Sequence, residues 1–210
     1  MAVQKKYLRT VLGECRVSLV PHFTKSRSVT IQHRLLATDC YRDARAIVLY
    51  SPIHNEVATD LIAADAIGSG KELFFPCLRR DRQSMTVARV HALSELVTGV
   101  FGIREPAAED ADPPAHELAG AMIVVPGLAF GPQGQRLGRG GGHYDRFLAA
   151  LPREAITVGL AYSFQLLDRI PQESFDRRLQ YIITESALIR VAEPHVQPLA
   201  VEVGRGGTPG

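Results

Sequence analysis

Short apolar runs alternate with helical patterns along most of this 210-residue chain, and the alternation limits the folds open to it. The runs A-I-V-L-Y (46–50) and I-T-V-G-L-A-Y (156–162) are rich in β-forming residues, as buried parallel strands are. Further strands are predicted over residues 72–78, 84–90 (an edge or antiparallel strand), 121–125 and 181–185. Strands that alternate with helices predict a single α/β domain, a three-layer Rossmann-like fold around a mostly parallel sheet.

Helical patterns are predicted before and between these strands. The first covers residues 4–18 and ends before Pro21. Its apolar residues recur at every fourth position, with basic residues on other faces; the apolar set includes Val3, Tyr7, Val11 and Cys15. Later helices are predicted over residues 28–37, 56–67 and 143–150.

Two segments carry no periodic pattern. Residues 104–117 are rich in proline and acidic side chains and are interpreted as a surface loop. The last residues, from 191 to 210, are predicted to form a loose tail behind a domain that covers residues 1–190.

Composition argues against several partners. The 24 basic and 22 acidic residues give a net charge of +2, so neither nucleic acid nor an anionic membrane is an expected partner. No apolar run approaches the roughly 20 residues of a membrane helix, and the first residues lack the apolar core of a signal peptide. Cys15, Cys40 and Cys77 form no C-x-x-C pair, which favours a cytoplasmic protein without disulfides or structural zinc. The moderate charge and the lack of an obvious exposed apolar stripe favour a monomer.

Residues 134–145 read G-Q-R-L-G-R-G-G-G-H-Y-D. The stretch follows the predicted strand 121–125 and precedes the predicted helix 143–150, so it is predicted to be a strand–loop–helix connection. Such connections lie at the edge of the sheet where ligands bind.

Three features of this stretch predict a phosphate site. Consecutive glycines, Gly140 to Gly142, let backbone N–H groups form an anion-binding concavity. The following helix adds its positive N-terminal end. Arg136 and Arg139 add charges that bind phosphate oxygens in a bidentate way. The common phosphate-loop patterns are nevertheless absent: G-S-G-K (68–71) is continued by glutamate, and the dinucleotide fingerprint fails at His143.

At this stretch the chain resembles the 5-formyltetrahydrofolate cyclo-ligase family, also called 5,10-methenyltetrahydrofolate synthetases. The matching run is P-G-L-A-F-G-P-Q-G-Q-R-L-G-R-G-G-G-H-Y-D-R-F-L (126–148). Shorter family elements extend the resemblance over most of the chain, namely K-K-Y-L-R (5–9), E-V-A-T (56–59), G-K-E-L-F-F-P (70–76), G-I-R-E-P (102–106) and P-Q-E-S-F-D-R-R-L-Q-Y-I-I-T-E (171–185).

The resemblance implies an enzyme that uses ATP and Mg²⁺ to convert 5-formyltetrahydrofolate into 5,10-methenyltetrahydrofolate, with ADP and phosphate as products and an N5-iminium phosphate as intermediate. It also implies roles for matching residues. Arg139 and Tyr144 are the expected catalytic residues, Glu56 and Tyr144 the expected folate contacts, and Asp145 and Asp176 the expected Mg²⁺ ligands. The expected ATP contacts are Lys5, Arg9, Arg136, Gly138, Arg139, Gly140, Gly141, Gly142, His143 and Asp145.

Simpler interpretations remain open for some of these residues. Glu56 and Asp145 could be acidic residues of a first helical turn, where a carboxylate is favourable in any case. Lys5 and Arg9 could belong to a solvated helix face. The basic residues that follow the strand 72–78 could attract the acidic tail of a folate or form a solvated loop; they are Arg79, Arg80 and Arg82.

Four positions depart from the family pattern. Gly131 stands in place of an aspartate, His143 in place of a tyrosine, Phe175 in place of a histidine and Gln180 in place of an aspartate. These departures keep two alternatives open: a relative that uses ATP on another heterocyclic metabolite, and a nucleotide- or folate-binding protein without turnover.

Overall fold

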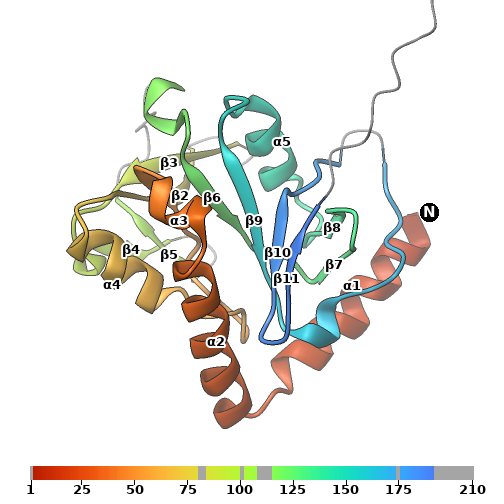
Figure 1. The fold of residues 1–210 in the computed structure, drawn as a ribbon. Coiled ribbons are helices and arrows are strands. Elements are labelled where there is room, and N and C mark those ends of the chain that lie inside the picture. Colours follow the sequence, from red (N-terminus) through yellow and green to blue (C-terminus); the bar gives the residue numbers. More distant parts are fainter. Residues whose placement is uncertain (1, 80–83, 100–101, 108–114, 174–175, 192–210) are drawn as a thin grey trace, which may run out of the picture.

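A computed structural model of the chain describes residues 2–79, 84–99, 102–107, 115–173 and 176–191 (Figure 1). Within these residues one seven-stranded sheet has the order β11-β10-β9-β6-β1-β2-β3. Its strands are β1 (Ala46–Val48), β2 (Glu72–Leu78), β3 (Met85–Arg89), β6 (Met122–Val125), β9 (Ile156–Leu160), β10 (Tyr181–Ile183) and β11 (Leu188–Arg190).

The sheet is mostly parallel, as predicted. Strands β10, β9, β6, β1 and β2 all pair in parallel. Each edge strand is antiparallel: β3 pairs with β2, and β11 pairs with β10. The prediction of an edge or antiparallel strand near β3 is therefore confirmed, whereas β11 was not predicted because a three-residue strand with exposed ends carries no clear pattern.

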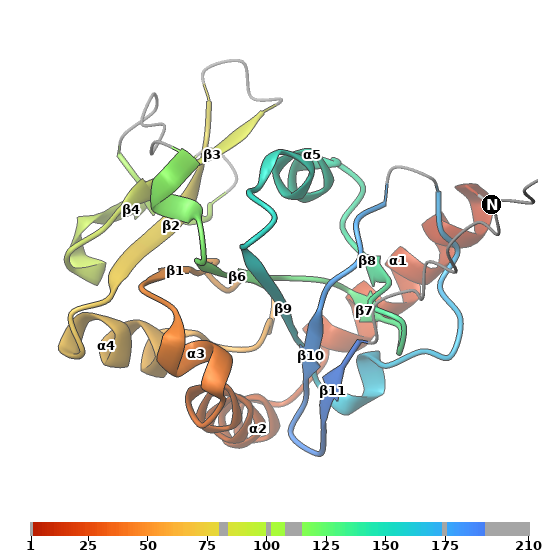
Figure 2. The ribbon, with the colours of Figure 1, turned by 45° about the horizontal axis from the view of Figure 1, so that its top comes forward.

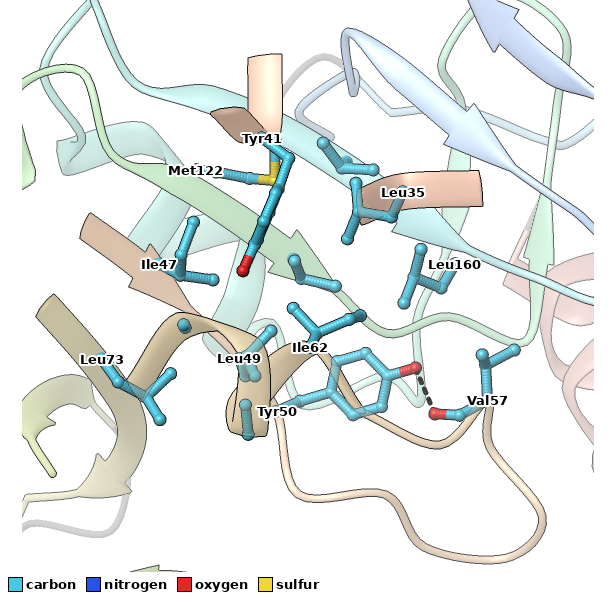
Figure 3. Close-up of a cluster of buried hydrophobic side chains, with 14 of the residues drawn as sticks. Leu35, Tyr41, Ile47, Leu49, Tyr50, Val57, Ile62, Leu73, Met122 and Leu160 are labelled. Carbon is cyan, nitrogen blue, oxygen red and sulfur yellow. Dashed lines mark hydrogen bonds between the residues drawn. The ribbon is translucent and has the colours of Figure 1, made fainter. Parts of the chain in front are cut away.

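Helices cover both faces of the sheet and make the three layers expected (Figure 2). One face carries α2 (Pro21–Leu36), α3 (Asp39–Asp43) and α4 (Asp60–Gly68). The other face carries α5 (His143–Ala150), whose Leu148 is buried against it. Successive strand residues serve opposite layers: Ile47 packs with the first group of helices and Val48 with the second. Figure 3 shows the first of these cores, where Leu35 and Ile62 approach the sheet.

A smaller unit lies beside one end of the sheet. Strands β7 (Ala129–Phe130) and β8 (Arg136–Leu137) form an antiparallel hairpin, and helix α1 (Ala2–Val17) packs beside it (Figure 1). Leu12 of α1 joins Leu137 of the hairpin in a separate apolar cluster. A second small antiparallel pair consists of β4 (Leu96–Thr98) and β5 (Arg104–Pro106). The remaining described elements are three short 3-10 helices, η1 (Leu93–Glu95), η2 (Ala115–Leu118) and η3 (Ser163–Gln165).

The first helix is confirmed, but its four-residue apolar repeat does not mark the buried face. Val3, Tyr7 and Val11 are 83%, 66% and 41% exposed, and Cys15 is exposed as well. The buried side chains of α1 are instead Lys5, Leu12 and Arg16. Leu12 packs on the hairpin, and Lys5 and Arg16 turn inward because carboxylates pair with them, so Val3, Tyr7 and Val11 meet solvent. Helix α1 therefore exposes an apolar stripe that the sequence did not predict, and the monomeric state stays a prediction.

Three element boundaries also differ from the prediction. Helix α2 begins at Pro21 and not near residue 28, because a proline at the first helical position needs no N–H partner. Helix α4 begins at Asp60 and not at residue 56, since the preceding residues turn through left-handed backbone at His54 and Asn55. The predicted surface loop at 104–117 begins with strand β5 and ends in η2.

The glycine stretch was predicted to connect strand β6 to helix α5 as a simple loop, and this prediction is wrong. The hairpin β7–β8 stands between β6 and the glycines and contributes Arg136 to the site. Two-residue strands of this kind are too short for a pattern to reveal them. The predicted tail beyond residue 191 lies outside the described residues. No helix in the described ranges combines the length and apolar character needed to span a membrane.

Gly159 of β9 lies where the sheet packs closely against the hairpin, so a substitution there can test this packing. A Cβ atom there would lie 2.5 Å from a ring carbon of Phe130 and 2.9 Å from Leu179. We expect Gly159→Ala to lower the free energy of unfolding by about 1–3 kcal/mol, measured by urea denaturation. The matched variant Gly13→Ala in α1, where a Cβ would meet nothing within 4 Å, should be neutral or stabilising by up to about 1 kcal/mol. Equal stability of Gly159→Ala and wild type would contradict this packing.

Candidate active site

The order of the strands creates a switch point beside β1. From β1 the chain continues to β2 on one side, and it later returns to place β6 on the other side. The segments that follow β1 and β6 therefore diverge at the carboxyl edge, and a crevice opens between them. A cavity of about 760 Å³ lies here, lined on these segments by Tyr50, Glu56, Pro126 and Gly127. Its volume is in the range of small-molecule sites.

Every residue that the sequence predicted for the site lines this cavity. They come from α1, the loop after β1, strand β8, the glycine loop, the start of α5 and the segment before β10; they are Lys5, Arg9, Glu56, Arg136, Gly138, Arg139, Gly140, Gly141, Gly142, His143, Tyr144, Asp145 and Asp176. Their positions near one another are a result of the fold. The role of each stays a prediction.

Helix α1 delivers Lys5 and Arg9 to the cavity from its inner face. The Lys5 amine bonds to Asp176 at 2.7 Å and to Glu173 at 3.0 Å. Burial lowers the pKa of Lys5, but the hydrogen bonds and charges of these two carboxylates outweigh it and leave the pKa above its ordinary value. Arg9 donates from Nε to the carbonyl oxygen of Gly138 at 2.9 Å. Neither residue lies on a solvated helix face, which was the simpler alternative.

The glycine loop curves around these cations. Gly140 has φ of 106° and Gly142 has φ of 67°, conformations that side chains rarely adopt. A Cβ at Gly138 would lie 2.7 Å from Nη1 of Arg136, and a Cβ at Gly141 would lie 2.8 Å from the His143 ring. Gly142 caps α5 without any side-chain hydrogen bond, so the first N–H groups of the helix remain available to an anion.

Arg136 is buried beside the start of α5. Its Nη2 donates to Asp145 at 2.8 Å, and its guanidinium lies 5.6 Å from the centre of the Tyr144 ring. Its Nε is buried and finds no hydrogen-bond partner among the described residues, which leaves a donor for a bound group. Burial and the charge of Glu56 raise the pKa of Tyr144, and Arg136 opposes the shift.

Glu56 lies in the loop before α4, so the interpretation as a helix-start acid is wrong. Its Oε1 accepts from Arg16 and from Arg139, both at 3.2 Å, and its Oε2 accepts the N–H of Ile53 at 3.1 Å. The Tyr50 hydroxyl donates to the carbonyl of Val57 at 2.8 Å and fixes the loop just beyond Glu56 (Figure 3). The glycine loop and the loop after β1 thus meet across the cavity through Arg139 and Glu56.

The sequence did not predict the apolar wall of the cavity. This wall comes from the loop after β1, strands β2 and β3 and the residue before β5; it consists of Ile53, Pro76, Cys77, Leu78, Met85 and Ile103. Cys77 is the buried cysteine among the three, whereas Cys15 is exposed. Only the rule that strand ends share one edge could have placed these residues at the site. Glu105 is the acidic residue beside this wall, and its Oε2 accepts the N–H of Leu78 at 3.4 Å.

No three His, Cys, Asp or Glu side chains of the described residues gather in a way that could hold a metal ion. Asp145 is paired with Arg136, and Asp176 is paired with Lys5. The protein by itself therefore offers single carboxylates. Mg²⁺ commonly binds one or two carboxylates together with substrate phosphates, so this donor set fits only an ion that arrives with a nucleotide.

The departures from the family pattern fall in different places. A Cβ at Gly131 would lie 2.4 Å from Oε1 of Gln135, so the Gln135 side chain takes up the space beside this glycine. Gln180 bonds to Thr157 and is not among the described lining residues. His143 lines the cavity, 3.4 Å from Arg146. Phe175, Arg80 and Arg82 lie outside the described residues, and Arg79 does not line the cavity.

Comparisons with known proteins agree with one another. A profile of the family described as "5-formyltetrahydrofolate cyclo-ligase family" matches residues 1–185. The probable 5-formyltetrahydrofolate cyclo-ligase of Caenorhabditis elegans is 27% identical and aligns over 88% of this chain and 92% of its own. The Haemophilus influenzae 5-formyltetrahydrofolate cyclo-ligase is 30% identical over 82% of this chain and 93% of its own. The solved Aquifex aeolicus 5,10-methenyltetrahydrofolate synthetase, 29% identical, superposes with a TM-score of 0.75 over 92% of this chain and 98% of its own.

The ion pairs of Lys5 with Asp176 and Glu173 should stabilise the folded protein. Lys5→Met leaves the Asp176 carboxylate without its cation, so the free energy of unfolding at neutral pH should fall by about 3 kcal/mol. Because the pKa of Lys5 is raised, this contribution is complete below the ordinary value of 10.5 and is lost as the pH rises above it. Denaturant unfolding at neutral and alkaline pH should show the two proteins converging in stability at the alkaline end.

Lys6→Met is the matched control, since Lys6 is exposed on the same helix. It should change the free energy of unfolding by no more than about 0.5 kcal/mol. Two outcomes would contradict this role of Lys5. One is an equal loss in the free energy of unfolding for both variants, and the other is a difference between them that does not change with pH.

Proposed function

This chain belongs to the 5-formyltetrahydrofolate cyclo-ligase family, and we propose that it carries out the family's reaction with ATP and Mg²⁺. The reaction converts 5-formyltetrahydrofolate into 5,10-methenyltetrahydrofolate. The observation that carries the proposal is the cavity itself, in which a glycine loop with two arginines faces a buried glutamate and an apolar wall. One half suits phosphates, and the other suits a flat heterocycle with N–H donors.

The cationic half supports ATP as the co-substrate. Arg9, Arg136 and Arg139 converge with the N–H groups at the start of α5 on a loop that has no Cβ atoms at three successive positions. Charges and N–H dipoles of this kind bind phosphate oxygens and neutralise the charge that develops in phosphoryl transfer. The buried, unpartnered Nε of Arg136 supports the same assignment.

The reaction that fits this arrangement has two steps. In the first, the formyl oxygen attacks the γ-phosphorus of ATP, the bond to the bridging oxygen breaks, and ADP leaves. In the second, N10 of the folate attacks the activated carbon of the N5-iminium phosphate, loses its proton and expels phosphate, which leaves the methenyl bridge. Neither step needs a strong protein base. Both need two substrates held in line, which a single cavity with two different halves provides.

The folate half rests on Glu56 and Tyr144. Glu56 is an acidic acceptor 7% exposed beside an apolar wall, where a carboxylate binds N–H donors strongly. Tyr144 lines the cavity beside Arg136, so its ring and hydroxyl are available for stacking and hydrogen bonding.

The donor set fits Mg²⁺ bound together with the nucleotide. Asp145 would hold the ion, with Asp176 as the second candidate, and the ion would supply charge neutralisation at the phosphates. Arg136 holds the Asp145 carboxylate in place at 2.8 Å. The monomeric state and the cytoplasmic location stay predictions; among the relatives, the Arabidopsis thaliana enzyme is named as mitochondrial.

The direct test is to incubate the pure protein with 5-formyltetrahydrofolate and Mg-ATP and to follow methenyl-folate absorbance. We expect product formation that depends on both substrates. ATP bound without product would contradict the proposal and favour a binding protein. ATP consumption that occurs only with another heterocycle would favour a relative with a different substrate.

Arg139→Ala removes a cation of the glycine loop, and it should raise the KM for ATP roughly tenfold, the effect of losing one charged hydrogen bond. Steady-state kinetics at varied ATP measures this. Arg153→Ala is the control, because Arg153 is exposed and is not among the described lining residues. Unchanged kinetics of Arg139→Ala would refute the assignment of the loop.

A further inference from the structure

Arg16 is a buried cation that does not belong to the described lining of the cavity. Its side chain is 2% exposed and comes from the last turn of α1. Burial lowers the pKa of its guanidinium, and the charge of Glu56 opposes the shift. A buried guanidinium destabilises the fold unless its N–H groups are hydrogen-bonded. The hydrogen-bond partners of Arg16 therefore show which segments it holds together.

Its partners lie on the two segments that diverge at the switch point. Nε donates to the carbonyl of His54 at 3.0 Å, and Nη1 donates to the carbonyl of Gly127 at 3.0 Å. Nη2 donates to Oε1 of Glu56 at 3.2 Å. One guanidinium therefore joins the segment after β1, the segment after β6 and the carboxylate that stands between them.

The loop that carries Glu56 needs such support. His54 and Asn55 have φ of 49° and 57°, a left-handed conformation that costs free energy in residues other than glycine. The Asn55 side chain donates to carbonyl oxygens at the end of α1, namely those of Arg16, Val17 and Leu19. The end of α1 and the loop thus hold each other, and the Arg16 side chain is the part of this contact that reaches Glu56.

The two arginines on Glu56 are not equivalent. Arg139 is 47% exposed and comes from the glycine loop, whereas Arg16 is 2% exposed and is held by two further carbonyls. A guanidinium with fixed partners and little access to water directs a carboxylate more firmly than an exposed one does. The exposed Arg139 remains available for a nucleotide, whereas the buried Arg16 is held on the carboxylate by its two loop carbonyls.

We propose that Arg16 is a positioning residue for the folate site: it sets the orientation of the Glu56 carboxylate and keeps it directed toward the N–H donors of the pterin. The inference rests on the proposed function, because it assumes that Glu56 binds the folate. Arg16 acts through Glu56 and touches no substrate itself.

The test compares Arg16→Lys and Arg16→Met with wild type in steady-state kinetics, with thermal unfolding as a check on folding. Arg16→Lys keeps the charge but loses the three-way fork, and we expect the KM for 5-formyltetrahydrofolate to rise about tenfold. The KM for ATP should stay within about twofold of wild type. Where Arg16→Met does not fold, Arg16→Lys decides the question.

A double-mutant cycle with Glu56→Gln separates positioning from general support. Glu56→Gln by itself should raise the KM for the folate about tenfold or more. In this background Arg16→Lys should add no more than about a twofold change, because its effect passes through the carboxylate. Additive effects, or an equal rise in both KM values, would overturn the proposal, since a structural role would act on both substrates.

Arg27→Lys is the matched control. Arg27 of α2 pairs with Glu185 just after β10 and is not among the described lining residues, so both KM values should stay unchanged. If wild type forms no methenyl product, the proposed function fails and this inference falls with it. If wild type is active and Arg16→Lys matches it, the inference alone is overturned.

Discussion

Charged side chains on the inner face of α1 are removed from water, and a charge in that setting needs partners of opposite sign or strong dipoles. Lys5 finds two carboxylates in the segment before β10, and Arg16 finds Glu56 and two loop carbonyls. The helix is thereby tied at both ends to the segments that border the cavity. The packing of Leu12 against the hairpin secures its middle.

The same requirement links the two halves of the site. Arg139 reaches from the glycine loop to Glu56, so the carboxylate of one half lies against a cation of the other. A bound nucleotide would compete for Arg139, and Glu56 would then keep Arg16 as its charged partner beside the N–H of Ile53. The buried arginine gives the folate half a cation that phosphates do not draw away, which lets two substrates of opposite chemical character share one cavity.

Much of the fold followed from local pattern. The apolar runs at β1, β2 and β9 are continuous because parallel strands are covered on both faces, and helix α5 begins at the residue predicted. The face of α1 did not follow. Its four-residue apolar repeat lies on the exposed side, whereas the structure buries Lys5 and Arg16 beside Leu12, because carboxylates and loop carbonyls beneath the helix pair with these two charges. The periodicity of a sequence shows which side of a helix is apolar, but it does not show whether that side contacts protein or solvent.

The sequence by itself determined the α/β class, the glycine loop with its two arginines and the family resemblance, because each depends on residues that are close along the chain. Only the tertiary structure decided that Glu56 faces this loop, that Cys77 and Met85 wall the same cavity, and that Arg16 holds the carboxylate. These residues come from separate elements. Their meeting depends on the order of the strands at the switch point, and that order is set by packing among distant segments.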